Sequence, residues 1–174
     1  MTYDYDEGRN IKFKEESYYL GKFNYIHGPN GCGKTMMLRV ISKKFKSVIY
    51  DPNIINEKKV RILNALLELA DKERVRYYLE SIDDYGASLM DRDYYSDTQL
   101  SLLYMCAAMA FGERSHKEFL LFDNIYWDNF DYDTKTVLVE TLDDYPTPVV
   151  LTGCTDNTLQ LVKTISHHPN IIRL

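Results

Sequence analysis

An eight-residue glycine-rich segment, from Gly28 to Thr35, constrains the fold of this chain more than any other feature. Its sequence, GPNGCGKT, matches the pattern G-x-x-x-x-G-K-[ST]. The run 22–27, with Phe23, Tyr25 and Ile26, is typical of a short strand and precedes it, and residues 34–45 follow with apolar side chains on one helical face. A strand, a glycine-rich loop and a helix in this order form an anion site, because the loop N–H groups converge and the helix N-terminus is partly positive. The segment therefore predicts a phosphate-binding loop in an α/β protein.

The residue types in this loop suit a nucleoside triphosphate bound to Mg²⁺. Lys34 would place its charge on the β and γ phosphates, and the Thr35 hydroxyl would contact the metal. We therefore expect a nucleoside triphosphate and Mg²⁺ as ligands. The expected nucleotide-binding residues of the loop are Gly28, Pro29, Asn30, Gly31, Cys32, Gly33, Lys34 and Thr35.

Apolar patterns along the rest of the chain alternate between strands and helices. We expect strands at 22–27, 47–50, 119–122, 148–152 and 170–174, and helices at 34–45, 57–81, 99–111, 133–142 and 156–165. The run 119–122 is apolar throughout, which is typical of a parallel strand covered on both faces. The pattern predicts one α/β domain over residues 1–174, with a mostly parallel sheet flanked by helices and a reduced helical insertion at about 56–98.

Composition limits the class of protein. With 174 residues, 45% of them hydrophobic and 27% charged, the chain is an ordinary globular one. No apolar run approaches the roughly 18 residues that span a bilayer. The acidic first seven residues do not resemble a signal peptide, so we expect a cytoplasmic protein without direct membrane insertion. The net charge of −5 disfavours direct nucleic-acid binding, so we expect any contact with nucleic acid to be made through a partner protein.

The loop sequence GPNGCGKT resembles that of ABC-type ATPases, including their SMC-like and RecF-like branch. The resemblance implies a P-loop NTPase fold and further motifs in a fixed order. The apolar run 119–122 followed by Asp123 is similar to a Walker B element, which implies that Asp123 contacts Mg²⁺ from the side opposite Thr35.

Residues 95–99 stand where the family carries its signature, and Ser96 and Gln99 match it although both glycines are replaced. In the family this serine faces a γ-phosphate held by a second molecule, which implies a nucleotide-dependent homodimer or hetero-partner. A plain helix N-cap explains the same two residues. The order of the motifs favours the signature interpretation, whereas Asp97 opposes it, because a carboxylate repels a γ-phosphate.

Three catalytic accessories of the family are absent from their usual places. Asn124 replaces the glutamate that follows the Walker B aspartate, no histidine follows the strand 148–152, and Asp51 or Asn53 occupies the position of the Q-loop glutamine. Asp51 is a candidate for a Mg²⁺ or water contact, and a turn before Pro52 is the alternative. Asn124 can orient water but cannot accept its proton. We therefore expect slow or absent ATP hydrolysis.

Two acidic residues offer a substitute for the missing base. Asp128 and Asp131 match the D-loop of the family in position, and such a residue contacts the active site of the partner. A solvated turn is the alternative interpretation. An aromatic residue ahead of the P-loop often stacks on adenine in this family, and the candidates are Tyr3, Tyr5, Tyr18 and Tyr19.

These motifs predict an ATP- and Mg²⁺-binding ABC-type protein that acts as a nucleotide-dependent dimerisation switch or weak regulatory ATPase, in a DNA-related or defence complex. The interval 36–95, between the P-loop and the signature segment, is too short for the coiled-coil arm that SMC-like proteins carry there. A first alternative is the ATPase subunit of a membrane transporter. A second is a small-metabolite kinase, in which Arg74, Arg76 and Arg92 would surround the phosphates.

Overall fold

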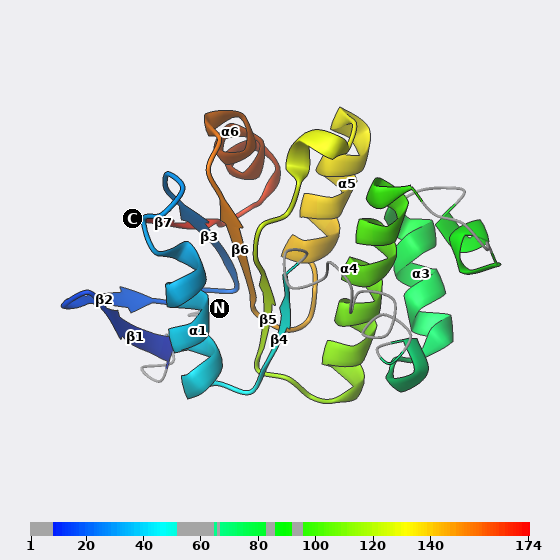
Figure 1. Ribbon diagram of the computed structural model, residues 1–174, viewed down its shortest axis with the longest axis horizontal. Helices are drawn as coiled ribbons and strands as arrows, with labels where there is room; N and C mark the ends of the chain where they lie inside the picture. The colour runs from blue at the N-terminus through cyan, green and yellow to red at the C-terminus, as the bar shows by residue number, and fades with distance from the viewer. Residues whose placement is uncertain (1–8, 52–64, 66, 83–85, 92–95) are drawn as a thin grey trace.

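The computed structural model describes residues 9–51, 65, 67–82, 86–91 and 96–174 (Figure 1). A five-stranded sheet lies at its centre, and every neighbouring pair in that sheet is parallel. In spatial order its strands are β4 (Ser47–Tyr50), β5 (Phe119–Phe122), β6 (Val149–Gly153), β3 (Phe23–His27) and β7 (Asn170–Arg173). The predicted α/β fold with a parallel sheet is confirmed, and all five strands end at the same edge.

The two faces of the sheet belong to two separate hydrophobic cores, because side chains alternate along a strand. On β5, Phe119 and Leu121 pack with α1 (Lys34–Lys44), whereas Leu120 and Phe122 belong to the larger core on the other face. The helices that contribute to this larger core are α3 (Lys72–Ile82), α4 (Asp97–Arg114), α5 (Tyr132–Asp143) and α6 (Asp156–Ile165). Figure 1 shows α1 on one side of the sheet and α3, α4 and α5 on the other.

Helix α4 occupies the middle of the larger core, as its apolar sequence predicts. Every residue from 102 to 110 is buried, so this helix contacts the protein on all sides. Helix α3 packs against α4 and α5 and forms an outer layer. Among the described residues, none of the helices has the length and hydrophobicity of a membrane span.

The helix expected at 57–81 is interrupted, so that expectation is corrected. Residues 65 and 67–69 are helical, a bend follows at Ala70, and α3 begins at Lys72. The Asp71 carboxylate accepts hydrogen bonds from the backbone N–H groups of Glu73 and Arg74, at 3.0 and 3.3 Å. Such a bond satisfies the first N–H groups of a new helix, which explains the break. Residues 57–64 and 66 lie outside the described residues, and a 3₁₀ helix, η3 (Gly86–Asp91), follows α3.

An antiparallel hairpin ahead of the P-loop was missed by the sequence analysis. Strands β1 (Asn10–Phe13) and β2 (Glu16–Tyr19) are joined by Lys14 and Glu15, whose φ angles are 49° and 69°. Two-residue hairpin turns with positive φ usually carry Asn, Asp or Gly, so the sequence LysGlu gives no turn signal. The buried side chains of this hairpin, Ile11 and Phe13, join the core under α1 and place the hairpin beside the P-loop.

Candidate functional site

The glycine-rich loop connects β3 to α1 at the edge where the parallel strands end. Gly31 and Gly33 have φ angles of 83° and 114°, which side chains other than glycine rarely adopt. Gly33 is the N-cap of α1, and no side chain among the described residues caps this helix. The first N–H groups of α1 are therefore available to an anion, which the helix dipole also favours.

Lys34 supplies a buried positive charge within the loop. Its side chain is largely buried, and its Nζ donates hydrogen bonds to the carbonyl oxygens of Gly28 and Pro29, at 2.7 and 2.9 Å. Within the described part of the chain, no carboxylate pairs with this ammonium group. Because a buried charge is stabilised best by an opposite charge, the loop presents a cation prepared for a phosphate.

Asp123 lies beside the loop and is held by three donors. One of its carboxylate oxygens accepts from the Thr35 hydroxyl at 2.5 Å, and the other accepts from the Thr152 hydroxyl at 2.7 Å and from the Asn124 backbone at 3.1 Å. The carboxylate is 1% exposed. Residues from α1 and from the ends of β5 and β6 therefore meet at one point, and Thr35 and Asp123 contact each other directly there.

The donor atoms at this point suit Mg²⁺. Thr35 and Asp123 offer hydroxyl and carboxylate oxygens, which are the hard ligands that Mg²⁺ prefers. In the described parts of the chain there is no cluster of three or more acidic, histidine or cysteine side chains that could enclose a metal alone. Mg²⁺ usually binds through one or two protein groups together with water and substrate phosphates, so a pair of oxygen donors beside a P-loop fits.

Asp51 and Asn124 form a contact across two neighbouring strands. Asp51 follows β4 and Asn124 lies two residues after β5, and the Asn124 side-chain amide donates to Asp51 Oδ1 at 3.3 Å. The Asp123 backbone N–H donates to the carbonyl oxygen of Tyr50, which fixes the two strand ends together. The third expected metal residue, Asp51, is thus brought to the same edge as Thr35 and Asp123.

Ser96 and Gln99 form a complete capping box at the start of α4. The Gln99 backbone donates to Ser96 Oγ at 3.2 Å, and the Ser96 backbone donates to the Gln99 side chain at 3.1 Å. This is the N-cap that the sequence analysis gave as an alternative. Ser96 and Asp97 are exposed, and Figure 1 shows that α4 begins at the same end of the molecule as the carboxyl ends of the strands.

The two acidic residues expected in the D-loop take different places. Asp128 is exposed within the short 3₁₀ helix η4 (Trp127–Asn129). Asp131 is the N-cap of α5, and its carboxylate accepts from the backbone and the hydroxyl of Thr134, at 2.8 and 2.9 Å. The hydrogen bond from the Thr134 backbone, together with that from its hydroxyl, lowers the pKa of Asp131. A lowered pKa makes this carboxylate a weaker proton acceptor.

Gly153 stands where a histidine was expected after the predicted strand 148–152, and in the structure it is the last residue of β6. Gly153 pairs with His27 of β3, and a Cβ atom built on Gly153 would lie 1.8 Å from the Tyr25 hydroxyl oxygen. Tyr25 is fully buried, so a side chain at 153 and the Tyr25 ring compete for the same space. The ring of His27 itself faces Asp156, with Nε2 to Oδ1 at 3.5 Å.

The hairpin contributes Lys14, which the sequence analysis missed. Its Nζ donates to the carbonyl oxygen of Cys32 in the P-loop at 2.5 Å. No signal marked Lys14, because the hairpin that carries it was not predicted. Of the adenine candidates, Tyr18 and Tyr19 lie half-buried on β2 of this hairpin, and Tyr3 and Tyr5 lie outside the described residues.

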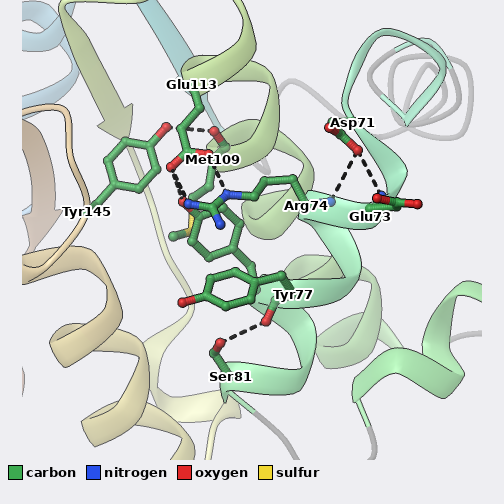
Figure 2. Close-up of polar contacts among 9 residues, drawn as sticks. Asp71, Glu73, Arg74, Tyr77, Ser81, Met109, Glu113 and Tyr145 are labelled. Carbon is green, nitrogen blue, oxygen red and sulfur yellow. Dashed lines mark hydrogen bonds and ion pairs between the residues drawn. The ribbon is translucent and has the colours of Figure 1, made fainter.

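The arginines considered for a kinase lid lie in the outer helical layer. Figure 2 shows Arg74 against Glu113 of α4, with hydrogen bonds of 2.6 Å from Nε and 3.0 Å from a terminal nitrogen. Tyr78 donates to the same Glu113 carboxylate at 2.5 Å. Arg76 lines a separate cavity of about 630 Å³ between α3 and η3, and Arg92 lies outside the described residues. Arg74 therefore joins two helices in this structure.

Comparisons with solved structures identify the fold. The dimeric structure of a bacterial ABC transporter cassette matches with a TM-score of 0.54 and 14% identity, covering 95% of this chain and 91% of that one. An inward-facing metal-chelate-type ABC transporter matches with a TM-score of 0.53 and 12% identity, covering 90% of this chain and 74% of that one. No family model and no curated protein matches the sequence.

Proposed function

From the fold of an ABC transporter cassette and an intact phosphate loop, we propose that this chain binds ATP with Mg²⁺ and associates with a second nucleotide-binding subunit around it. The observation that carries the proposal is the convergence of Lys34, Thr35 and Asp123 at the carboxyl edge of the parallel sheet. Ligands of open α/β sheets bind at this edge. The geometry supports a nucleotide site because cation, metal ligands and free helix N–H groups occur together.

Each group would have one task in the bound state. The N–H groups at the start of α1 would surround the phosphates, and Lys34 would exchange its bonds to the loop carbonyls for bonds to phosphate oxygens. Thr35 and Asp123 would hold Mg²⁺, which when bound neutralises charge on the β and γ phosphates. The hydrogen bond between Thr35 and Asp123 keeps both side chains directed at the same place beforehand.

Association around the nucleotide would use residues that are exposed at the same end of the molecule. Ser96 begins α4 with a helix N-terminus toward solvent, and Asp128 and Asp131 lie on the segment between β5 and α5. The capping box fixes the shape of the α4 N-terminus. The partner would be a second copy of this chain or a different nucleotide-binding subunit.

Hydrolysis would be slow, so that the nucleotide acts as a switch. Asn124 cannot take a proton from water, and Gly153, which lies against Tyr25, replaces the histidine expected after the predicted strand 148–152. Losing a general base typically costs about 10²–10⁴ in rate. A long-lived ATP-bound state follows, and the assembled subunits would persist until the nucleotide is hydrolysed or released.

Calorimetric titration tests the nucleotide site. ATP with Mg²⁺ should bind to the wild type, and Lys34→Ala should abolish the heat of binding. Lys22→Ala is the matched control, because its ammonium donates to the carbonyl of Pro146 at the other end of β3. Equal affinity in Lys34→Ala and in the control would show that the loop is not the binding site.

A transporter ATPase subunit is the second candidate function. The observation that favours it is that both solved structures named above are transporter cassettes or transporters. In this case the chain would be recovered with a membrane protein that it binds through its outer helical layer. Purification from detergent-solubilised membranes separates the two candidates, since a switch protein of the first kind would remain in the soluble fraction.

A further inference from the structure

Asp51 lies at the carboxyl edge of the sheet, beside the segment that carries Asp123. It directly follows β4, and Asp123 directly follows β5, the neighbouring parallel strand. Tyr50 and Phe122 are paired residues in these strands, and adjacent strands lie about 4.8 Å apart. Asp51 therefore flanks the Asp123 segment on the side away from Thr152.

Asn124 connects Asp51 to this site through three hydrogen bonds. Its backbone N–H lies 3.1 Å from both Asp123 Oδ1 and Thr152 Oγ1, and its side-chain amide lies 3.3 Å from Asp51 Oδ1. The φ angle of Asn124 is 50°, a left-handed conformation in which asparagine is enriched. The backbone is thus fixed by the metal-site residues, and the amide of the same residue orients the Asp51 carboxylate.

The other described carboxylates near the site are occupied differently. Both oxygens of Asp123 accept hydrogen bonds within the metal site. Asp131 caps α5, and Asp128 is exposed on η4. Asp51 is half-buried, contacts the residue next to Asp123, and comes from a different strand.

We propose that Asp51 is the general base of the slow ATP hydrolysis, with Asn124 as its positioning residue; this inference rests on the proposed function. A water oxygen forms a bond to the γ-phosphorus while the bond from that phosphorus to the β–γ bridging oxygen breaks. The proton of the water passes to the Asp51 carboxylate, and ADP leaves with the bonding electrons. The products are ADP and inorganic phosphate, and no other reactant is needed.

Asp51→Asn tests the base, because it keeps the shape of the side chain and removes the proton acceptor. Single-turnover phosphate release should fall by about 10² or more, while the affinity for ATP and its dependence on Mg²⁺ stay as in the wild type. The ATP-bound assembly of the variant should also outlive that of the wild type in light scattering. In Asn124→Ala the rate of phosphate release should fall less, by about tenfold, because this substitution removes only an orienting hydrogen bond.

Added formate distinguishes a base from a structural residue. Formate can enter the space left by Asp51→Ala and accept the proton, so it should restore part of the turnover of this variant and none in Lys34→Ala. Unchanged turnover in Asp51→Asn would overturn the assignment, as would a wild type that binds ATP without any turnover. A weaker Mg²⁺ dependence of ATP binding in Asp51→Asn would show a metal ligand instead. Absence of ATP binding in the wild type would contradict the proposed function itself.

Discussion

Replacing Gly153 by alanine should destabilise the protein strongly. An added Cβ would lie 1.8 Å from the Tyr25 hydroxyl oxygen and 2.6 Å from its Cζ atom, where real Cβ atoms keep at least 3.0 Å. The Tyr25 ring is fully buried and packs beside His27, so it has little room to move. Overpacking of a core costs about 1–3 kcal/mol, and occasionally more. We expect about 3 kcal/mol here, the upper end of that range.

Thermal unfolding measures this cost directly. For a chain of 150–250 residues, 1 kcal/mol shifts the melting temperature by about 2–4 °C, so Gly153→Ala should lower it by about 6–12 °C. Gly21→Ala is the control, because its added Cβ would lie 3.6 Å from the nearest side-chain atom, an ordinary contact. That variant should melt close to the wild type.

A second substitution tests whether the Tyr25 hydroxyl causes the clash. Within the described structure this hydroxyl is buried without a hydrogen-bond partner, and burial raises its pKa. Tyr25→Phe alone should therefore be close to neutral. Combined with Gly153→Ala it should recover more than about 1 kcal/mol, a typical coupling between residues in contact. A melting temperature in Gly153→Ala equal to that of Gly21→Ala would refute the steric argument, whereas a double variant without recovery would assign the clash to the ring, whose Cζ atom lies 2.6 Å from the added Cβ.

Three further results are expected. Glu113→Gln should cost about 1 kcal/mol at neutral pH, measured by urea unfolding, because Arg74 and Tyr78 both donate to this carboxylate. Burial favours a higher pKa for Glu113, yet those bonds outweigh it and hold the pKa below its usual value. The free energy of unfolding of the wild type should therefore lose this contribution as pH falls through the lowered pKa. The variant lacks the contribution at every pH, so its free energy of unfolding should depend less steeply on pH in acid. Ser96→Ala should cost about 0.5–2 kcal/mol through the lost N-cap. Ser96→Arg should prevent ATP-dependent association, and an unchanged assembly would rule out a role for Ser96 at the interface.

The local sequence predicted the central sheet well. Strands β4 and β5 are short runs rich in apolar residues, and both have the expected bounds. The strand, glycine-rich loop and helix around Lys34 were also predictable from residue types and order, and the structure brings Thr35 and Asp123 into contact. The hairpin was not, because Lys14 and Glu15 adopt positive φ without the usual turn residues.

Contacts between distant residues could not be inferred from local patterns. Asp51 and Asn124 are 73 residues apart, and their contact depends on β4 and β5 lying side by side. The same holds for Gly153, whose lack of a side chain has a reason only once the Tyr25 ring is placed on the neighbouring strand. In both cases the sheet order supplies the information that the sequence lacks.

Light scattering on the purified chain tests the central claim most directly. The proposal predicts a monomer of 20.4 kDa without nucleotide. With ATP and Mg²⁺, the apparent mass should rise toward twice this value if the partner is a second copy of the chain. If the partner is a different subunit, the mass should rise toward that of the complex once this subunit is added. Lys34→Ala should show no rise under the same conditions. A mass that is independent of ATP in the wild type, with and without subunits that co-purify with it, would contradict the account.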